Sequence, residues 1–272
     1  MVTTHASDKE TTVFSGLIDL DFGKVVCGIG KFVTGYVSAA SSRGVVIGLS
    51  GGLDSSVAAK LCTLSLGKDR VCGLILPSSI TPKRDIDDAT DFANELGIKH
   101  KVIDIRPILD RFMEVLPADK RAEGNLAARV RMSILYHFAY TKKNLVVGTS
   151  DKSELYIGYF TKFGDGGADL LPIADLYKIQ VRALGRFLGL PPNILEKKSS
   201  PQLWKDHLAE EELGITYETL DPILHLLVDV KLTVRDAAKQ LGVPISQVKK
   251  VQEMMDRSAH KRNRAAIAFI HG

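Results

Sequence analysis

One segment near residue 50 limits the possible folds of this chain more than any other part of the sequence. Residues 45–49 form a short apolar run typical of a buried strand, and Ser-Gly-Gly-Leu-Asp-Ser over 50–55 leads directly into a helix predicted over 53–66. The two glycines let a ligand approach the main chain closely, and the free amides at a helix start favour an anion. The segment therefore predicts a polyphosphate site at the end of a strand.

Asp54 is the unexpected member of this turn, because a carboxylate repels a phosphate. Its most economical role is to hold a magnesium ion that bridges to the phosphates. The turn differs from the Walker loop, since no Lys follows the glycines, and from the dinucleotide fingerprint Gly-x-Gly-x-x-Gly. A strand-to-helix turn can also carry Gly and Ser for geometry alone, and that alternative stays open here.

Short apolar runs alternate with helical stretches through the middle of the chain. Runs rich in Val, Ile and Leu predict strands buried on both faces, and the alternation predicts a parallel sheet. The predicted strands are Val45 to Leu49, Val71 to Leu76, Val102 to Ile105 and Leu145 to Val147, and the predicted helices are Leu53 to Leu66, Asp85 to Leu96, Ile108 to Leu116, Leu126 to Thr141 and Tyr177 to Leu188. We expect an α/β fold with a doubly wound, mostly parallel sheet flanked by helices. Ligands bind such sheets at the carboxyl ends of strands, so the loops at 50–52 and 148–150 should face one crevice.

The composition is that of an ordinary globular protein. The chain has 272 residues, of which 45% are apolar, and a net charge of +4 that suits anionic small ligands as well as nucleic acid. Three cysteines without Cys-x-x-Cys spacing indicate reduced thiols. No apolar run approaches the roughly 18 residues of a membrane span, and no targeting leader is evident, so we expect a cytoplasmic protein without a membrane partner. We expect one domain over 1–272, with a flexible 1–14, a nucleotide-binding core at 45–190 and a C-terminal helical segment at 205–262 that completes the site.

Two helical segments lie outside this core. Apolar residues recur at three- and four-residue intervals over 25–37 and predict a helix that covers the core or a partner subunit. Residues 233–251 predict a helix, a Gly turn and a second helix, which is the outline of a DNA-reading helix-turn-helix. The second helix lacks a dense basic or amide face for base edges, so packing on the sheet domain is the favoured interpretation.

A second polar segment follows the fourth predicted strand. In Gly-Thr-Ser-Asp-Lys-Ser-Glu over 148–154, Thr149 is placed to meet a nucleotide, and Glu154 is placed to share one magnesium ion with Asp54. An acidic residue also favours a helix start for its own sake. Residues 159–172 are dense in Gly and Asp between aromatic residues, but they do not satisfy the calcium-loop pattern. Recognition of a polar organic substrate is the stronger interpretation.

These motifs together resemble a known family. The turn at 50–55 resembles the pyrophosphate loop of the ATP pyrophosphatases, and the sequences at 124–132, 148–172, 175–178 and 260–262 are similar to those of ammonia-dependent NAD synthetase. The resemblance implies an adenine nucleotide alpha hydrolase-like fold and a homodimer. It also implies ATP with Mg²⁺, deamido-NAD and ammonia as ligands, and no nucleic acid.

The resemblance also implies roles for individual residues. It assigns ATP binding to Gly48, Leu49, Ser50, Gly51, Gly52, Leu53, Asp54, Ser55, Thr149, Lys178 and Ser200, magnesium to Asp54 and Glu154, and deamido-NAD to Arg129, Lys162, Asp169, His260 and Lys261. The chain departs from the family pattern in two places. Residues 151–153 read Asp-Lys-Ser where the family often has His-Ala-Ala, and 198–204 is offset from Pro-Ser/Thr-Ala-x-Leu. Residues 151–153 therefore receive no role.

The implied reaction is the amidation that ends NAD biosynthesis, catalysed by a ligase. The nicotinate carboxylate of deamido-NAD attacks the α-phosphate of ATP, and ammonia then expels AMP from the acyl adenylate. Asp54, Glu154 and Asp169 are the catalytic candidates, and Asp169 would help ammonium lose a proton. Residues 1–44 cannot house an amidase domain, so free ammonia is expected unless a separate subunit delivers it. The alternatives are another adenylating ATP pyrophosphatase, such as a tRNA thiolase or GMP synthetase, and a helix-turn-helix DNA-binding regulator.

Overall fold

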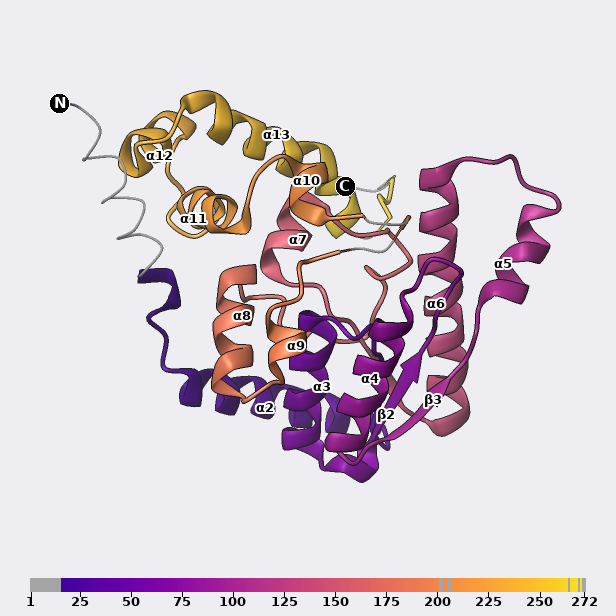
Figure 1. Ribbon diagram of the computed structural model, residues 1–272. Coiled ribbons are helices and arrows are strands. Elements are labelled where there is room, and N and C mark those ends of the chain that lie inside the picture. Colours follow the sequence, from indigo (N-terminus) through magenta and orange to yellow (C-terminus); the bar gives the residue numbers. More distant parts are fainter. Residues whose placement is uncertain (1–15, 201–202, 205–206, 264, 269, 271–272) are drawn as a thin grey trace.

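A four-stranded parallel sheet forms the centre of the molecule (Figure 1). The computed structural model describes residues 16–200, 203–204, 207–263, 265–268 and 270, so the prediction of a flexible 1–14 lies outside the described residues. The strands β1 (Val45–Gly48), β2 (Val71–Ile75), β3 (Lys99–Val102) and β4 (Leu145–Val147) lie in the order β3-β2-β1-β4. Val45 pairs with Val71 on one side and with Leu145 on the other. The predicted parallel α/β sheet is confirmed.

Helices cover both faces of the sheet (Figure 1). Val45 and Ile47 point to one face, where α2 (Phe22–Ala39), α3 (Leu53–Leu66), α4 (Lys83–Glu95) and α8 (Lys178–Phe187) pack. Val46 points to the other face, which α6 (Lys120–Lys142) covers, while α5 (Arg106–Met113) packs beside α6. Alternating side chains of a central strand thus enter two separate cores, which confirms the doubly wound arrangement.

The helix predicted over 25–37 serves the core of its own chain. In α2, Val33 and Val37 are fully buried in the same apolar cluster as α3. Phe32 and Tyr36 on the same helix remain 45% and 43% exposed. The helix therefore covers the sheet layer with one face and leaves an aromatic face uncovered.

The C-terminal helices form a third apolar cluster beside the sheet. They are α7 (Lys152–Ile157), α10 (Ala209–Leu213), α11 (Tyr217–Val228), α12 (Val234–Leu241) and α13 (Ile245–Arg262). The short helix α9 (Pro192–Leu195) packs instead against α3 and α8 in the first core. The turn between α12 and α13 begins at Gly242, whose φ of 72° suits glycine. Leu241, Val248 and Val251 are buried against α11. The predicted helix pair is present, and its apolar sides pack inside the protein.

The third strand was predicted in the wrong place. It runs over Lys99–Val102 rather than 102–105, and its residues are mostly exposed because β3 is an edge strand. The apolar run that misled the prediction packs under α6, where Ile105 is fully buried at the start of α5. An edge strand need not be apolar on both faces, so the rule for buried parallel strands failed here.

The long helix α6 also begins earlier than the predicted residue 126. Asp119 caps its first turn by accepting a hydrogen bond from the amide of Ala122 at 2.8 Å. Gly124 lies in that first part because a Cβ there would come within 2.7 Å of the Leu203 side chain. A glycine that weakens helix propensity is thus required by a close contact.

The cysteines and the apolarity of the helices complete the description of the fold. Cys27, Cys62 and Cys72 are free thiols. No helix in the described part of the chain combines the length and apolarity that a membrane crossing requires.

Candidate active site

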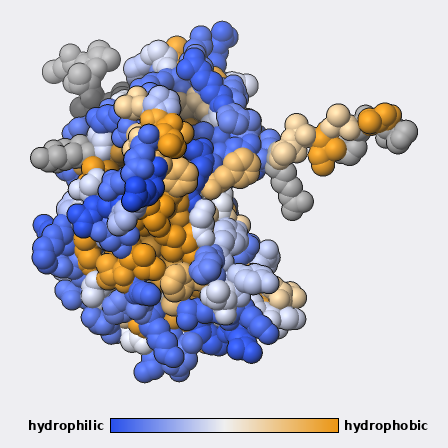
Figure 2. Space-filling model, turned by 90° about the vertical axis from the view of Figure 1, so that its right-hand side faces the viewer, coloured by the Kyte–Doolittle hydropathy of each residue, from blue (hydrophilic) through white to orange (hydrophobic). Residues whose placement is uncertain are grey.

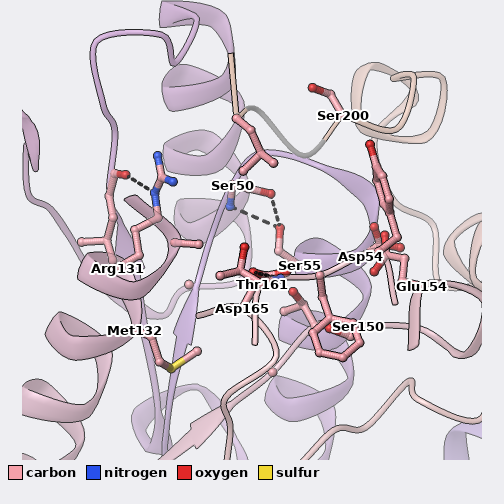
Figure 3. Close-up of a pocket in the computed structure, with 18 of the residues that line it drawn as sticks. Ser50, Asp54, Ser55, Arg131, Met132, Ser150, Glu154, Thr161, Asp165 and Ser200 are labelled. Atoms are coloured by element: carbon pink, nitrogen blue, oxygen red, sulfur yellow. Dashed lines mark hydrogen bonds between the residues drawn. The ribbon is translucent and has the colours of Figure 1, made fainter. Parts of the chain in front are cut away.

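One cavity collects the loops that follow β1 and β4 (Figure 3). It has a volume of about 510 Å³, a size typical of small-ligand sites, and lies where the strand order reverses between these strands. The lining includes the predicted residues Gly48, Leu49, Ser50, Asp54, Ser55, Thr149, Glu154, Ser200 and Lys261. The C-terminal helices reach the same cavity through Ala209 and Glu212 as well as Lys261. The prediction that both loops face one crevice is confirmed.

The turn at 50–55 is held in an anion-binding shape by its own hydrogen bonds. The Ser55 hydroxyl accepts from the Ser50 amide at 3.3 Å and lies 3.1 Å from the Ser50 hydroxyl, and the Gly52 amide donates to Ser50 Oγ at 3.2 Å. Gly51 has a φ of 74°, and a Cβ there would collide with the Asp85 carbonyl. Gly51 is therefore required both by its backbone angle and by close packing on α4.

Lys178 lies beneath this turn, not in the cavity. Its side chain is fully buried, and its ammonium lies 2.8 Å from Asp54 Oδ2, 2.8 Å from Glu154 Oε1 and 2.9 Å from Asp151 Oδ2. The structure thus brings together three residues that the sequence placed in the site, but it surrounds the lysine with carboxylates. Sequence reasoning missed Asp151, whose fully buried side chain also caps α7 by accepting from the Glu154 amide at 2.8 Å.

This carboxylate cluster has strongly perturbed electrostatics. Burial raises the pKa of the Glu154 carboxyl well above its usual range; the Lys178 ammonium opposes that rise, and the nearby Asp151 and Asp54 add to it. Burial also lowers the pKa of Lys178, but the carboxylates of Asp151, Asp54 and Glu154 outweigh burial and leave it well above its usual value. Lys178 therefore keeps its positive charge, while Glu154 binds a proton more readily than a free carboxyl does.

The donor atoms around Asp54 fit a magnesium ion. Asp54 Oδ1 is buried without a hydrogen-bond partner among the described residues. The side chains of Asp54 and Glu154 are 24% and 19% exposed, and both line the cavity. No group of three or more metal-binding side chains occurs in the described part of the chain. Magnesium commonly takes only one or two carboxylates and completes its shell with phosphate and water, so a two-carboxylate site suits it.

Residues 151–153, which received no role from the sequence, connect the site to the C-terminal helices. Lys152 Nζ donates to Asp229 Oδ1 at 2.8 Å. The Ser153 hydroxyl donates to the buried Asp221 carboxylate at 2.6 Å and accepts from the Lys178 amide at 2.9 Å. These polar contacts anchor the start of α7 between α8 and α11.

Four of the five residues assigned to deamido-NAD form a group beside the cavity. Arg129 Nε donates to the Lys162 carbonyl at 3.3 Å, and Lys162 Nζ donates to the His260 carbonyl at 2.6 Å. Lys261 Nζ donates to the carbonyls of Gly158 and Phe160 at 2.8 Å each. Of the four, Lys261 lines the cavity, and the others extend from it across the neighbouring surface.

Asp169 lies outside the cavity, against β4. Its Oδ2 accepts from the Val146 amide at 2.7 Å, and its Oδ1 accepts from the Tyr136 hydroxyl at 3.1 Å. Burial raises the pKa of Tyr136 to about 12, and the Asp169 carboxylate adds to the rise. The phenol therefore stays protonated and keeps donating to Asp169 near neutral pH.

Asp165 and Arg131 are charged residues of the cavity to which the sequence analysis gave no role. Asp165 lines the cavity with an exposed side chain, and its carboxylate accepts from the Thr161 amide at 2.9 Å. Arg131 donates through Nε to the Leu76 carbonyl at 2.9 Å, and burial lowers the pKa of its guanidinium (Figure 3). The signals were present, since Asp165 lies in the Gly-Asp-Gly-Gly loop and Arg131 is the second Arg of Arg-x-Arg. Spacing alone did not show which acidic or basic residue faces inward.

An aromatic and acidic group lines another part of the cavity. Glu212 Oε2 accepts from the Tyr159 hydroxyl at 2.9 Å and lies 2.7 Å from His207 Nε2, while Arg121 pairs with the other oxygen of Glu212 at 3.0 Å. The Trp204 ring stacks on His207 with centroids 3.4 Å apart. The single tryptophan of the chain and the tyrosine in the Gly-rich loop were the available signals.

Comparisons with known proteins agree with this geometry. The family model for NAD synthase matches residues 25–265. An NH(3)-dependent NAD(+) synthetase from Hyperthermus butylicus is 48% identical over 250 residues, which cover 91% of this chain and 91% of the relative. An NH3-dependent NAD synthetase structure from Campylobacter jejuni has a TM-score of 0.79 and 32% identity, and the match covers 92% of this chain and 100% of that one.

A further solved structure is similar in fold and length. An NMN synthetase from Francisella tularensis has a TM-score of 0.81 and 35% identity, and the match covers 92% of this chain and 99% of that one. The family match spans the loops after β1 and β4 together with the C-terminal helices that reach the cavity. This chain therefore belongs to the NAD synthase family.

Proposed function

We propose that this chain catalyses the ATP-dependent amidation of deamido-NAD by ammonia, forming NAD, AMP and pyrophosphate. One observation carries the proposal. The strand-end loops after β1 and β4 bring Asp54 and Glu154 to the same buried ammonium, 2.8 Å from each, beside a Ser-Gly-Gly turn shaped for an anion. The related NH(3)-dependent NAD(+) synthetase of Hyperthermus butylicus supports the choice of reaction.

ATP would bind with its phosphates against the turn at 50–55. The turn's amides and the Ser50 and Ser55 hydroxyls would hold the departing pyrophosphate, aided by the start of α3. Asp54 and Glu154 would hold Mg²⁺, which neutralises phosphate charge when bound. Lys178 would act from below by fixing both carboxylates, a different role from direct phosphate contact. Thr149 and Ser200 line the cavity where they can meet the nucleotide.

The reaction needs no covalent enzyme intermediate. The nicotinate carboxylate attacks the α-phosphate and pyrophosphate leaves; ammonia then attacks the acyl carbonyl of the adenylate and AMP leaves. Ammonium must lose a proton to become the nucleophile. Asp165 suits that step because its exposed carboxylate lines the cavity. Asp169 is less well placed, since its oxygens hold Val146 and Tyr136 outside the cavity.

The dinucleotide would extend from the cavity over the group formed by Arg129, Lys162 and His260, towards a partner subunit. Figure 2 shows hydrophobic residues gathered on the face that carries α5 and α6. The exposed large apolar side chains of these helices and of the turn after α5 are Ile108, Phe112, Val115, Leu116, Tyr136 and Tyr140. A patch of this kind marks an interaction surface, and we propose that two copies pair through it. Arg129 lies on α6, so substrate contacts would adjoin that interface.

Nicotinate mononucleotide is a second candidate for the acid that is amidated. The observation that favours it is the fold similarity to the NMN synthetase from Francisella tularensis, with a TM-score of 0.81. Both acids present the same nicotinate carboxylate to the adenylation site. They differ in whether the substrate has an adenylate half that contacts the residues beside the cavity.

A cytoplasmic location stays a prediction.

The decisive experiment mixes purified chain with ATP, Mg²⁺ and deamido-NAD and measures NAD, AMP and pyrophosphate with ammonium or glutamine as donor. We expect the three products in equal amounts with ammonium. Asp54→Ala and Glu154→Ala should each abolish turnover, whereas Asp87→Ala, at an exposed site on α4, should not. Absence of NAD with either donor would refute the function. If the chain amidates nicotinate mononucleotide faster than deamido-NAD, the mononucleotide is the substrate instead. Equal rates with glutamine and ammonium would refute the free-ammonia proposal.

Light scattering tests the homodimer. Tyr140→Glu, at an 88% exposed position on α6, should shift the protein from dimer to monomer and raise the KM for deamido-NAD. Leu64→Glu, at a 57% exposed position on α3, is the matched control and should leave the mass unchanged. A wild-type mass equal to one chain would contradict the proposed interface.

A further inference from the structure

Lys197 connects three parts of the protein around the pyrophosphate turn. Its ammonium donates to the Gly51 carbonyl at 2.7 Å, to Asp85 Oδ1 at 2.9 Å and to Asp88 Oδ2 at 2.7 Å. Asp85 and Asp88 are both buried on α4, and Asn193 holds the other oxygen of Asp88 at 2.6 Å. Two carboxylates of α4 thus fix the lysine, and the lysine in turn binds the Gly51 carbonyl of the turn.

The direction of the Gly51 carbonyl, which Lys197 holds, decides which polar groups of the turn face a ligand. A peptide unit presents either its amide or its carbonyl to one side, and a carbonyl facing a phosphate would repel it. This peptide lies between Gly51 and Gly52, neither of which has a Cβ, so it can rotate more readily than one in a regular strand. The Lys197 contact holds the Gly51 carbonyl against α4.

Lys197 acts from outside the ligand cavity. Asp54, Ser55, Ser199 and Ser200 line that cavity, whereas Lys197 lies behind the turn with its charge matched by Asp85 and Asp88. Lys197 also directly precedes the segment that carries Ser199 and Ser200. One side chain therefore joins the turn to a second wall of the cavity.

We propose that Lys197 is a positioning residue for ATP: it holds the Gly51 carbonyl away from the phosphates, so that the hydroxyls of the turn and the first amides of α3 face them. The inference rests on the proposed function for its meaning, because it concerns the nucleotide half of that same site. It assigns no contact between Lys197 and any ligand. Its effect should appear in the ligand-free turn and in ATP binding, not in the ammonia step.

The test compares Lys197→Met and Lys197→Arg with Lys198→Met, which changes the exposed neighbour. Amide hydrogen exchange of residues 50–55 is measured without ligand, ATP affinity by calorimetry with Mg²⁺, and KM for each substrate by turnover. Lys197→Met should speed exchange in the turn and weaken ATP binding roughly tenfold to a hundredfold, the loss expected for one charged hydrogen bond. The KM for ammonium should stay unchanged, Arg should restore most of the affinity, and Lys198→Met should match the wild type.

Several results would overturn the proposal. Unchanged exchange in the turn with weakened ATP binding would make Lys197 a direct ligand contact. Unchanged ATP affinity, or equal losses for ATP and ammonium that Arg does not restore, would also refute it. If Lys197→Met does not fold, Asp88→Asn must show a weaker form of the same ATP-selective pattern. Exchange and calorimetry need no turnover, so they remain decisive even if the wild type forms no NAD.

Discussion

Replacing Lys178 by Met tests the electrostatic account of the site most directly. The ammonium is fully buried and lies within 2.9 Å of three carboxylates, so the variant leaves Asp54, Asp151 and Glu154 without their cation. Removing one partner of a buried ion pair costs about 3–5 kcal/mol. Asp54 and Glu154 are 24% and 19% exposed and can regain some hydration, which places the expected loss near the lower end, at about 3 kcal/mol.

The sign of the pH dependence follows from the carboxylates. Burial raises the pKa of Asp151 and of Glu154 in the folded protein, and loss of the lysine should raise them further. An acid with a raised folded pKa destabilises the fold increasingly as pH rises from its unfolded pKa through its folded pKa. The difference between wild type and Lys178→Met should therefore be small at pH 5 and largest at pH 8.

The assay is urea unfolding of the ligand-free protein at one fixed protein concentration and at both pH values. Asp151→Asn provides the opposite perturbation, because it removes one surplus negative charge while Asn can still cap α7. It should cost less than Lys178→Met at pH 8. Lys198→Met, at an exposed site, should change the free energy of unfolding by less than about 0.5 kcal/mol. Equal costs for Lys178→Met and Asp151→Asn, or a loss independent of pH, would refute the reasoning.

Three further outcomes can be checked separately. Gly51→Ala should destabilise the fold by at least about 1–2 kcal/mol and weaken ATP binding, whereas Gly28→Ala, with open space around its Cβ in α2, should stabilise the fold by about 0.5–1 kcal/mol. Urea unfolding and calorimetry would contradict this if the two variants had the same stability and the same ATP affinity. Burial raises the pKa of Asp221 to about 8, so its contribution to stability should fall as pH rises from about 4 to 8; Asp221→Asn should flatten that part of the unfolding profile, and an unchanged slope would count against it. Burial raises the pKa of Cys62 to about 12, so iodoacetamide at pH 8 should label exposed Cys27 and spare Cys62 until urea unfolds the chain; mass spectrometry showing early Cys62 labelling would contradict its burial.

The sequence predicted the central part of the fold well because buried parallel strands leave a strong local signal. Val45–Gly48 and Leu145–Val147 are apolar throughout, and both were located to within a residue or two. The edge strand Lys99–Val102 carries no such signal, since its exposed residues need not be apolar. The neighbouring apolar run around Ile105 belongs to the α6 core and attracted the prediction instead.

The sequence predicted many of the residues of the candidate site, but not how these residues are arranged. The turn at 50–55, Thr149 and Glu154 were placed in one crevice because strand-end loops meet at the switch point of the sheet. The burial of Lys178 could not be inferred, because its three carboxylate partners come from α3 and the start of α7, distant in sequence. Asp165 and Asp169 lie in the same Gly-rich loop, and only the path of that loop decides which one faces the cavity.

The two margins of the sheet bear on how copies of this chain can associate. At one margin, β3 carries Lys99 and Lys101 on an exposed strand, which would repel the same strand of another copy. At the other margin, the Asp169 carboxylate occupies the Val146 amide, and the Asp169 amide donates to the Val146 carbonyl at 3.0 Å. One margin is thus positively charged and the other is occupied by Asp169, so continuous intermolecular sheets are disfavoured. Any assembly of this enzyme should instead be built through its helices, with each sheet kept separate.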